Sequence, residues 1–154
     1  MEWALRCTWL LTFARDDDAL PARRLAEFYG LPEAYLAKLL KTLVRAGLLG
    51  SASGPRGGFR LARPPEEITV ADVVAAVEGP GPLFHCTEIR QRGPVPLTAA
   101  ACRQPCGIAQ VMSRAERAWR NELAATTIAD LVKTSGVGAV TRVSAWLAAL
   151  PRVS

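Results

Sequence analysis

The sequence predicts a mainly α-helical fold, in which a winged helix-turn-helix region with one small β-hairpin wing precedes a long helix. Three observations predict it. Two short amphipathic segments flank a Gly-Leu-Pro turn, a Gly-rich stretch between two short apolar segments follows them, and a long apolar stripe with helical spacing lies nearer the C-terminus. The 154 residues correspond to about one domain.

The composition favours a globular protein with a nucleic-acid partner. Half of the residues are hydrophobic and 21% are charged, which excludes a disordered chain. The net charge of +5 gives a surface that suits nucleic acid. No apolar run approaches the roughly 20 residues needed to cross a bilayer, and no secretory signal is evident. We therefore expect a cytoplasmic protein with no membrane partner.

The first three elements follow from apolar spacing and turn residues. Residues 2–14 are apolar on most faces and predict a mostly buried helix. A short helix over 22–29 ends at Gly30, which can adopt the left-handed conformation, and Pro32 can start the next helix over 33–46. The buried face of that helix is formed by Leu36, Leu39, Leu40 and Leu43. A short helix, a Gly-containing turn and a second helix form a helix-turn-helix arrangement.

The outer face of the 33–46 helix is basic, and a wing follows it. At about 100° per residue, Ala34, Lys38, Lys41 and Arg45 point away from the leucines. Strands over 48–52 and 58–62 form a hairpin with Arg56 at its tip. Lysine and arginine contact phosphates and guanine edges, and the small Ala34 side chain permits close approach to the major groove of DNA. A basic wing tip suits insertion into the minor groove. The alternative is a solvated charged face. The predicted DNA contacts are Ala34, Tyr35, Lys38, Lys41, Arg45, Arg56, Gly57, Gly58 and Arg60.

The second half of the chain contains a helix, an irregular loop and two further helices. We expect a helix over 68–78 with Thr69 as its N-cap, and an irregular segment over 79–105 that is rich in glycine and proline. A helix over 107–132 would be roughly 40 Å long, and a role in dimerisation explains that length. An amphipathic helix over 140–150 ends the chain. The expected regions are therefore a DNA-binding winged helix (1–65), a helix and cysteine loop (66–106), and a dimerisation helix with a C-terminal helix (107–154).

Three cysteines lie in or beside the irregular segment. Cys102 and Cys106 lie close together around the start of the 107–132 helix, and a helix N-terminus stabilises thiolates; Cys86 precedes them. Thiolates are ligands of zinc and of iron–sulfur clusters, and the spacing alone does not select between them. The alternative is two small buried hydrophobes and one stray thiol. Cys7 fits the core of the first helix. With one histidine, His85, and no phosphate-binding loop, we expect no enzyme.

Segments along almost the whole chain resemble the Rrf-type family of bacterial winged-helix regulators. The shared segments are Leu25-Ala26-Glu27, Tyr35-Leu36-Ala37-Lys38, 43–48, Gly57-Gly58-Phe59-Arg60-Leu61, Ile68-Thr69 and 73–79. Three others, Glu2-Trp3-Ala4-Leu5, 86–94 and 124–132, resemble the redox-sensing RsrR subgroup of actinobacteria.

The resemblance implies a homodimer that binds a double-stranded DNA operator and holds a [2Fe–2S] cluster near the dimer interface. In the redox-sensing subgroup, loop cysteines share the cluster with a glutamate and a histidine of the partner's first helix. The implied ligands are Cys86, Cys102, Cys106 and Glu2. Arg6 occupies the histidine position, and a guanidinium cannot bind iron because it stays protonated.

The resulting hypothesis is a transcriptional repressor whose operator affinity depends on the redox state or the presence of the cluster. Arg6 gives weight to a metal-free relative that uses the three cysteines as a thiol switch or senses nothing. A third reading is an iron–sulfur assembly or electron-transfer protein, which the basic helix face disfavours.

Overall fold

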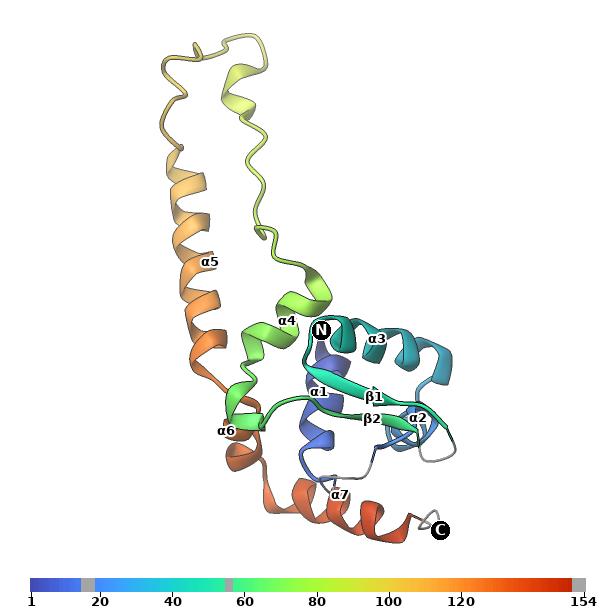
Figure 1. The fold of residues 1–154 in the computed structure, drawn as a ribbon. Helices are drawn as coiled ribbons and strands as arrows, with labels where there is room; N and C mark the ends of the chain where they lie inside the picture. Colours follow the sequence, from blue (N-terminus) through green and yellow to red (C-terminus); the bar gives the residue numbers. More distant parts are fainter. Residues whose placement is uncertain (15–18, 55–56, 151–154) are drawn as a thin grey trace. The chain divides into compact units, whose positions relative to one another are not determined.

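The computed structural model describes residues 1–14, 19–54 and 57–150 and is mainly helical with one two-stranded hairpin (Figure 1). Its elements in chain order are α1 Glu2–Leu11, α2 Ala22–Tyr29, α3 Glu33–Arg45, β1 Leu49–Ala52, β2 Gly58–Leu61, α4 Val70–Glu78, α5 Gly107–Ala125, α6 Ile128–Thr134 and α7 Val137–Ala149. Single 3₁₀ turns lie at Pro65–Glu67 and Ile89–Gln91. The predicted fold class is confirmed.

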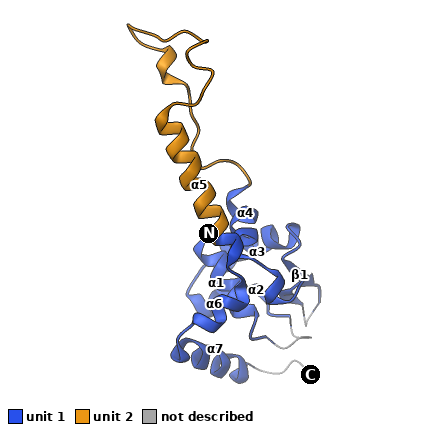
Figure 2. Cartoon of the chain, turned by 90° about the vertical axis from the view of Figure 1, so that its left-hand side faces the viewer, with its two compact units in different colours: residues 1–79, 123–154 blue, residues 80–122 orange. Residues whose placement is uncertain are grey.

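The chain divides into two compact units, which Figure 2 shows in separate colours. The first unit contains Met1–Gly79 and Leu123–Ser154, and the second contains Pro80–Glu122. We refer to the second as the cysteine unit, since Cys86, Cys102 and Cys106 all belong to it.

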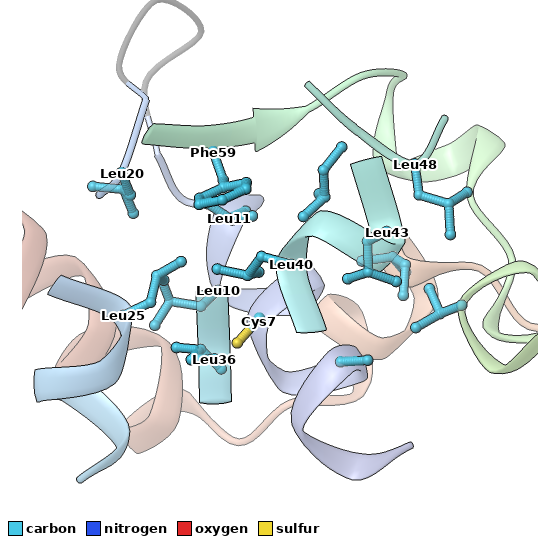
Figure 3. Packing of buried hydrophobic residues seen from close by; sticks show 14 of the residues in the cluster. Cys7, Leu10, Leu11, Leu20, Leu25, Leu36, Leu40, Leu43, Leu48 and Phe59 are labelled. Atoms are coloured by element: carbon cyan, nitrogen blue, oxygen red, sulfur yellow. The ribbon is translucent and has the colours of Figure 1, made fainter. Parts of the chain in front are cut away.

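The core of the first unit lies between α1, α2, α3 and the hairpin (Figure 3). Leu36, Leu40 and Leu43 are fully buried, as the spacing of the α3 leucines predicts. Cys7 lies among these leucines in Figure 3, and burial raises the pKa of its thiol to about 12. Cys7 is therefore a core residue, as its place in the apolar first helix predicts.

The helix-turn-helix and the wing form as expected, with small shifts at the element ends. Gly30 takes the left-handed conformation at φ 66° and ψ 38°, so that the Leu31 N–H reaches the Ala26 carbonyl at 2.9 Å. In the antiparallel hairpin, Ser51 lies opposite Phe59. Phe59 also exchanges two backbone hydrogen bonds with Leu20, of 2.8 and 2.9 Å, which ties the wing to the segment before α2.

The helix expected over 107–132 is two helices, because a new N-cap interrupts it. α5 ends at Ala125, and the Thr127 side chain accepts from the Asp130 N–H while Asp130 accepts from the Thr127 N–H. The Val70 N–H also donates to the Thr126 carbonyl at 2.9 Å. At 19 residues, α5 is roughly 28 Å long rather than roughly 40 Å.

Two other helix boundaries differ from the expectation by three residues. α1 ends at Leu11, where the Thr12 hydroxyl donates to the Trp9 carbonyl at 2.7 Å, rather than continuing to residue 14. α7 starts at Val137 instead of residue 140. Thr69 caps α4 as predicted, with the same reciprocal bonds to Asp72. No helix of the described residues is long and apolar enough to span a membrane.

Candidate functional site

A groove of about 760 Å³ runs between α3 and the hairpin in the first unit. Its wall combines small apolar residues with the basic face of α3. The lining residues are Ala34, Ala37, Lys38, Lys41, Val44, Arg45, Ser51 and Phe59. Four of the nine predicted DNA contacts therefore lie on one concave surface.

The basic side chains of this groove are exposed and carry no ion pair within the described residues. Lys38, Lys41 and Arg45 all face solvent. The Arg45 guanidinium donates to the Thr42 hydroxyl at 3.2 Å, and that hydroxyl donates to the Lys38 carbonyl at 3.2 Å. These bonds orient Arg45 without neutralising it, so the groove keeps three positive charges for an anionic ligand.

The other predicted contacts lie outside the groove wall. Tyr35 is 51% exposed on α3, and Arg60 is exposed on β2. Gly57 and Gly58 lie in or next to the hairpin. A Cβ atom on Gly58 would lie 2.4 Å from the Leu20 carbonyl carbon, so close packing of two backbones accounts for this glycine. Arg56 lies outside the described residues.

The groove also contains residues that the sequence reasoning missed. Ala37 and Val44 flank the basic face of α3, and Ser51 reaches the groove from β1. The strand pairing was the available signal for Ser51. Residues that lie opposite each other in an antiparallel pair point to the same face, and Ser51 lies opposite Phe59, which also lines the groove.

The three cysteines of the cysteine unit differ in exposure, and all are free thiols. Cys86 is exposed, whereas Cys102 and Cys106 are half-buried. Cys106 precedes the first residue of α5, where its Sγ accepts from the Ala109 N–H at 3.5 Å and its carbonyl accepts from the Gln110 N–H at 2.9 Å. The expected position of Cys106 at a helix start is confirmed.

A charged pair that the sequence reasoning also missed joins the two sides of the loop. Arg90 donates to both carboxylate oxygens of Glu88, at 2.5 and 2.7 Å, and to the Gln104 carbonyl at 3.1 Å. Hydrogen bonding from Arg90, with a smaller contribution from the Cys102 thiol, holds the pKa of Glu88 below its usual value. Glu88 has a left-handed backbone at φ 51°, which is unusual for a residue with a side chain.

The residues expected to hold a cluster supply suitable atoms without forming a complete site in one chain. Three thiols are appropriate ligands for iron. Among the described residues, however, no three His, Cys, Asp or Glu side chains converge in a way that could hold a metal ion. Glu2 is engaged by Arg6, whose Nε lies 2.9 Å from its Oε1. A preassembled single-chain metal site therefore does not fit this arrangement.

Comparisons with known proteins agree with the fold. The Rrf2 family profile, described as an iron-dependent transcriptional regulator, matches residues 1–134. Protein aau3 of Rhizobium meliloti is 38% identical over 109 residues, which cover 71% of this chain and 67% of that protein. YwgB of Bacillus subtilis, which carries the name of an HTH-type transcriptional regulator, is 32% identical over 121 residues, or 79% of this chain and 74% of that protein.

Two solved structures share the fold at low sequence identity. CymR, the global cysteine regulator of B. subtilis, superimposes with a TM-score of 0.70 at 24% identity, covering 88% of this chain and 94% of that chain. IscR of T. potens superimposes with a TM-score of 0.65 at 23% identity, covering 91% of each chain.

Proposed function

Since this chain belongs to the Rrf2 family of transcriptional regulators, we propose that it is a cytoplasmic DNA-binding repressor rather than an enzyme. The observation that carries the proposal is the groove between α3 and the hairpin, with its three unpaired cations. In this proposal α3 enters the major groove of a double-stranded operator. Lys38, nearer the start of α3, reaches base edges, and Lys41 and Arg45 bind phosphates.

The hairpin supplies a second set of contacts in this proposal. Ser51 lines the same groove as the cations, and its hydroxyl can donate to a phosphate oxygen. Arg60 and Arg56 extend the basic surface toward the neighbouring minor groove. The role of Gly57 and Gly58 is structural, because a Cβ at either position would collide with neighbouring backbone atoms.

The proposed assembly is a homodimer formed through α5. No residue of α5 is buried, although it carries an apolar stripe. Ile108, Val111 and Met112 on that stripe are 67%, 52% and 38% exposed. A second copy of the chain would cover this stripe and place two copies of α3 on successive half-sites of an operator.

We propose an iron–sulfur cluster, of the [2Fe–2S] type, as the group through which the cysteine unit senses. The family description as iron-dependent and the three loop thiols support this assignment. Cys86, Cys102 and Cys106 would hold the cluster, with Glu2 of the partner subunit as a further ligand once it is released from Arg6. The cluster would supply one-electron redox chemistry. Placement in the RsrR subgroup rests on the sequence segments alone.

A metal-free thiol switch is the second candidate, and two observations favour it. Arg6, which cannot bind iron, forms an ion pair with Glu2. In the described part of the chain, no three His, Cys, Asp or Glu side chains converge as metal ligands. Under this second candidate function, oxidation of the thiols in the cysteine unit changes the DNA affinity without a cluster.

Absorbance of protein purified without oxygen, with iron and sulfide assays, separates the two candidates. A cluster gives absorbance between about 400 and 500 nm that bleaches with dithionite, and equal iron and sulfide. The C86S/C102S/C106S variant should be colourless. A colourless, iron-free wild-type protein that still binds a duplex selected from a random pool would leave the thiol switch. A coloured protein that selects no duplex would point to electron transfer or cluster assembly.

A further inference from the structure

The cysteine unit contains an open cavity of about 610 Å³ that no part of the proposed DNA contact or α5 pairing uses. Its wall brings two thiols, Cys86 and Cys102, together with three guanidinium groups, Arg103, Arg114 and Arg117. All of these residues belong to Pro80–Glu122, so the cavity is formed within one compact unit.

The cavity is cationic because its carboxylates are already paired. Glu88 is bound by Arg90, and Glu116 accepts from Arg120 at 2.8 Å. In the described part of the chain, no ion pair engages Arg103, Arg114 or Arg117. The polar side chains of Gln110 and Ser113 complete the wall beside them. This arrangement suits a small ligand that carries more than one carboxylate.

The two thiols are not equivalent. Cys102 is half-buried on the cavity wall it shares with Glu88, whose carboxylate is held by Arg90. Cys86 is exposed at the cavity wall, and the described residues offer it no hydrogen-bond partner. A reagent in the cavity therefore meets the Cys86 sulfur as the accessible nucleophile.

Dimerisation through the apolar stripe of α5 leaves the cavity open. On the helical wheel, Ala109, Ser113 and Arg117 of the cavity wall lie on one side of α5. The exposed apolar residues Ile108 and Val111 lie on the other side. A second copy packed on the stripe would therefore not block access to Cys86 from the cavity.

We propose that this cavity binds a small disulfide that carries carboxylates and that Cys86 forms a mixed disulfide with it in the metal-free protein. The Cys86 sulfur, after losing its proton to solvent, attacks one sulfur of the bound disulfide. The S–S bond of the reagent breaks, a new S–S bond joins Cys86 to one half, and the other half leaves as a thiolate. Arg114 and Arg117 hold the carboxylates during this exchange. The inference deepens the proposed function, since it names a chemistry that regulates the same unit.

The test compares an anionic and a neutral disulfide on the reduced, metal-free full-length chain. Oxidised glutathione and hydroxyethyl disulfide are added separately, and intact mass with peptide mapping gives the rate at each cysteine. We expect Cys86 to react first. The rate ratio of the anionic to the neutral reagent should fall about tenfold in the R114Q/R117Q variant. Added salt should lower the wild-type ratio as well.

The R23Q/R92Q variant is the matched control, because it removes the same charge from residues outside the cavity wall. It should keep the wild-type ratio. The proposal is overturned if R114Q/R117Q also keeps that ratio, if Cys102 or Cys106 is modified first, or if no mixed disulfide forms. These measurements involve neither iron nor DNA. A negative result would therefore overturn the disulfide proposal without affecting the proposed DNA-binding function. A failure to bind DNA would likewise not affect the disulfide proposal.

Discussion

Gly58 shows at the residue scale how a backbone requirement can look like a binding motif. The Gly-Gly pair resembles a flexible wing, yet a Cβ at Gly58 would meet the Leu20 carbonyl carbon at 2.4 Å and its oxygen at 2.5 Å. We predict that Gly58→Ala lowers the free energy of unfolding by about 1–3 kcal/mol, because the two backbones must separate. Chemical denaturation measures this. Gly138→Ala in α7, where a Cβ meets nothing within 4 Å, should cause no loss.

The lysines of α3 test the groove one charge at a time. We predict that Lys38→Gln and Lys41→Gln each weaken binding to a selected duplex and, where the lysine binds a phosphate, lower the slope of log K against log salt by about 1. Fluorescence anisotropy at several salt concentrations gives both quantities. Lys133→Gln removes the same charge from α6 and should leave the slope unchanged. Equal losses in all three variants would mean that net charge, rather than the groove, governs binding.

The cap of α6 gives a pH-dependent prediction at the element scale. Hydrogen bonding from Lys133, and then from Thr127, lowers the pKa of Asp130 from an ordinary 3.8 to about 2. A lowered folded-state pKa adds stability that is fully present above the ordinary value and is lost as pH falls toward 2. We expect Asp130→Asn to reduce the loss of stability between about pH 4 and pH 2. Acid titration of the unfolding midpoint checks this, and an unchanged acid limb in the variant would contradict it.

The elements also show which parts of the fold follow from the sequence. The α2–turn–α3 segment was predictable because apolar spacing, Gly30 and Pro32 agree locally. The break between α5 and α6 was missed because the apolar stripe reaches Trp119 and Leu123, close to the break, and no glycine or proline occurs over residues 123–132 to mark it. The Thr127-to-Asp130 spacing repeats that of Thr69 and Asp72, so the cap itself was the available signal.

The candidate sites were predictable to different degrees. Residue type and spacing found the basic face of α3 and the three loop cysteines. The bridge from Glu88 through Arg90 to Gln104 was not predictable, because it depends on how the two sides of an irregular loop approach each other.

The whole molecule is predicted to be a dimer through the stripe of α5. A carboxylate at Val111 would be buried without a partner in that interface, so Val111→Asp should weaken the dimer at least about tenfold. Analytical ultracentrifugation over a range of concentrations measures the change. Ser113→Asp, on the cavity side of the same helix, is the control. If it dissociates the protein as strongly as Val111→Asp does, α5 pairs through another face.

In the proposed regulator, the state of the cysteine unit sets the DNA affinity of the winged helix. The most direct measurement is Kd for one selected duplex, at fixed salt, before and after an oxygen-free preparation is oxidised and stripped of iron. We expect Kd to change at least about fivefold for the wild-type protein. We expect the C86S/C102S/C106S variant to have the same Kd in both states. Equal wild-type values in the two states would contradict it and leave a DNA-binding protein whose cysteines do not control binding.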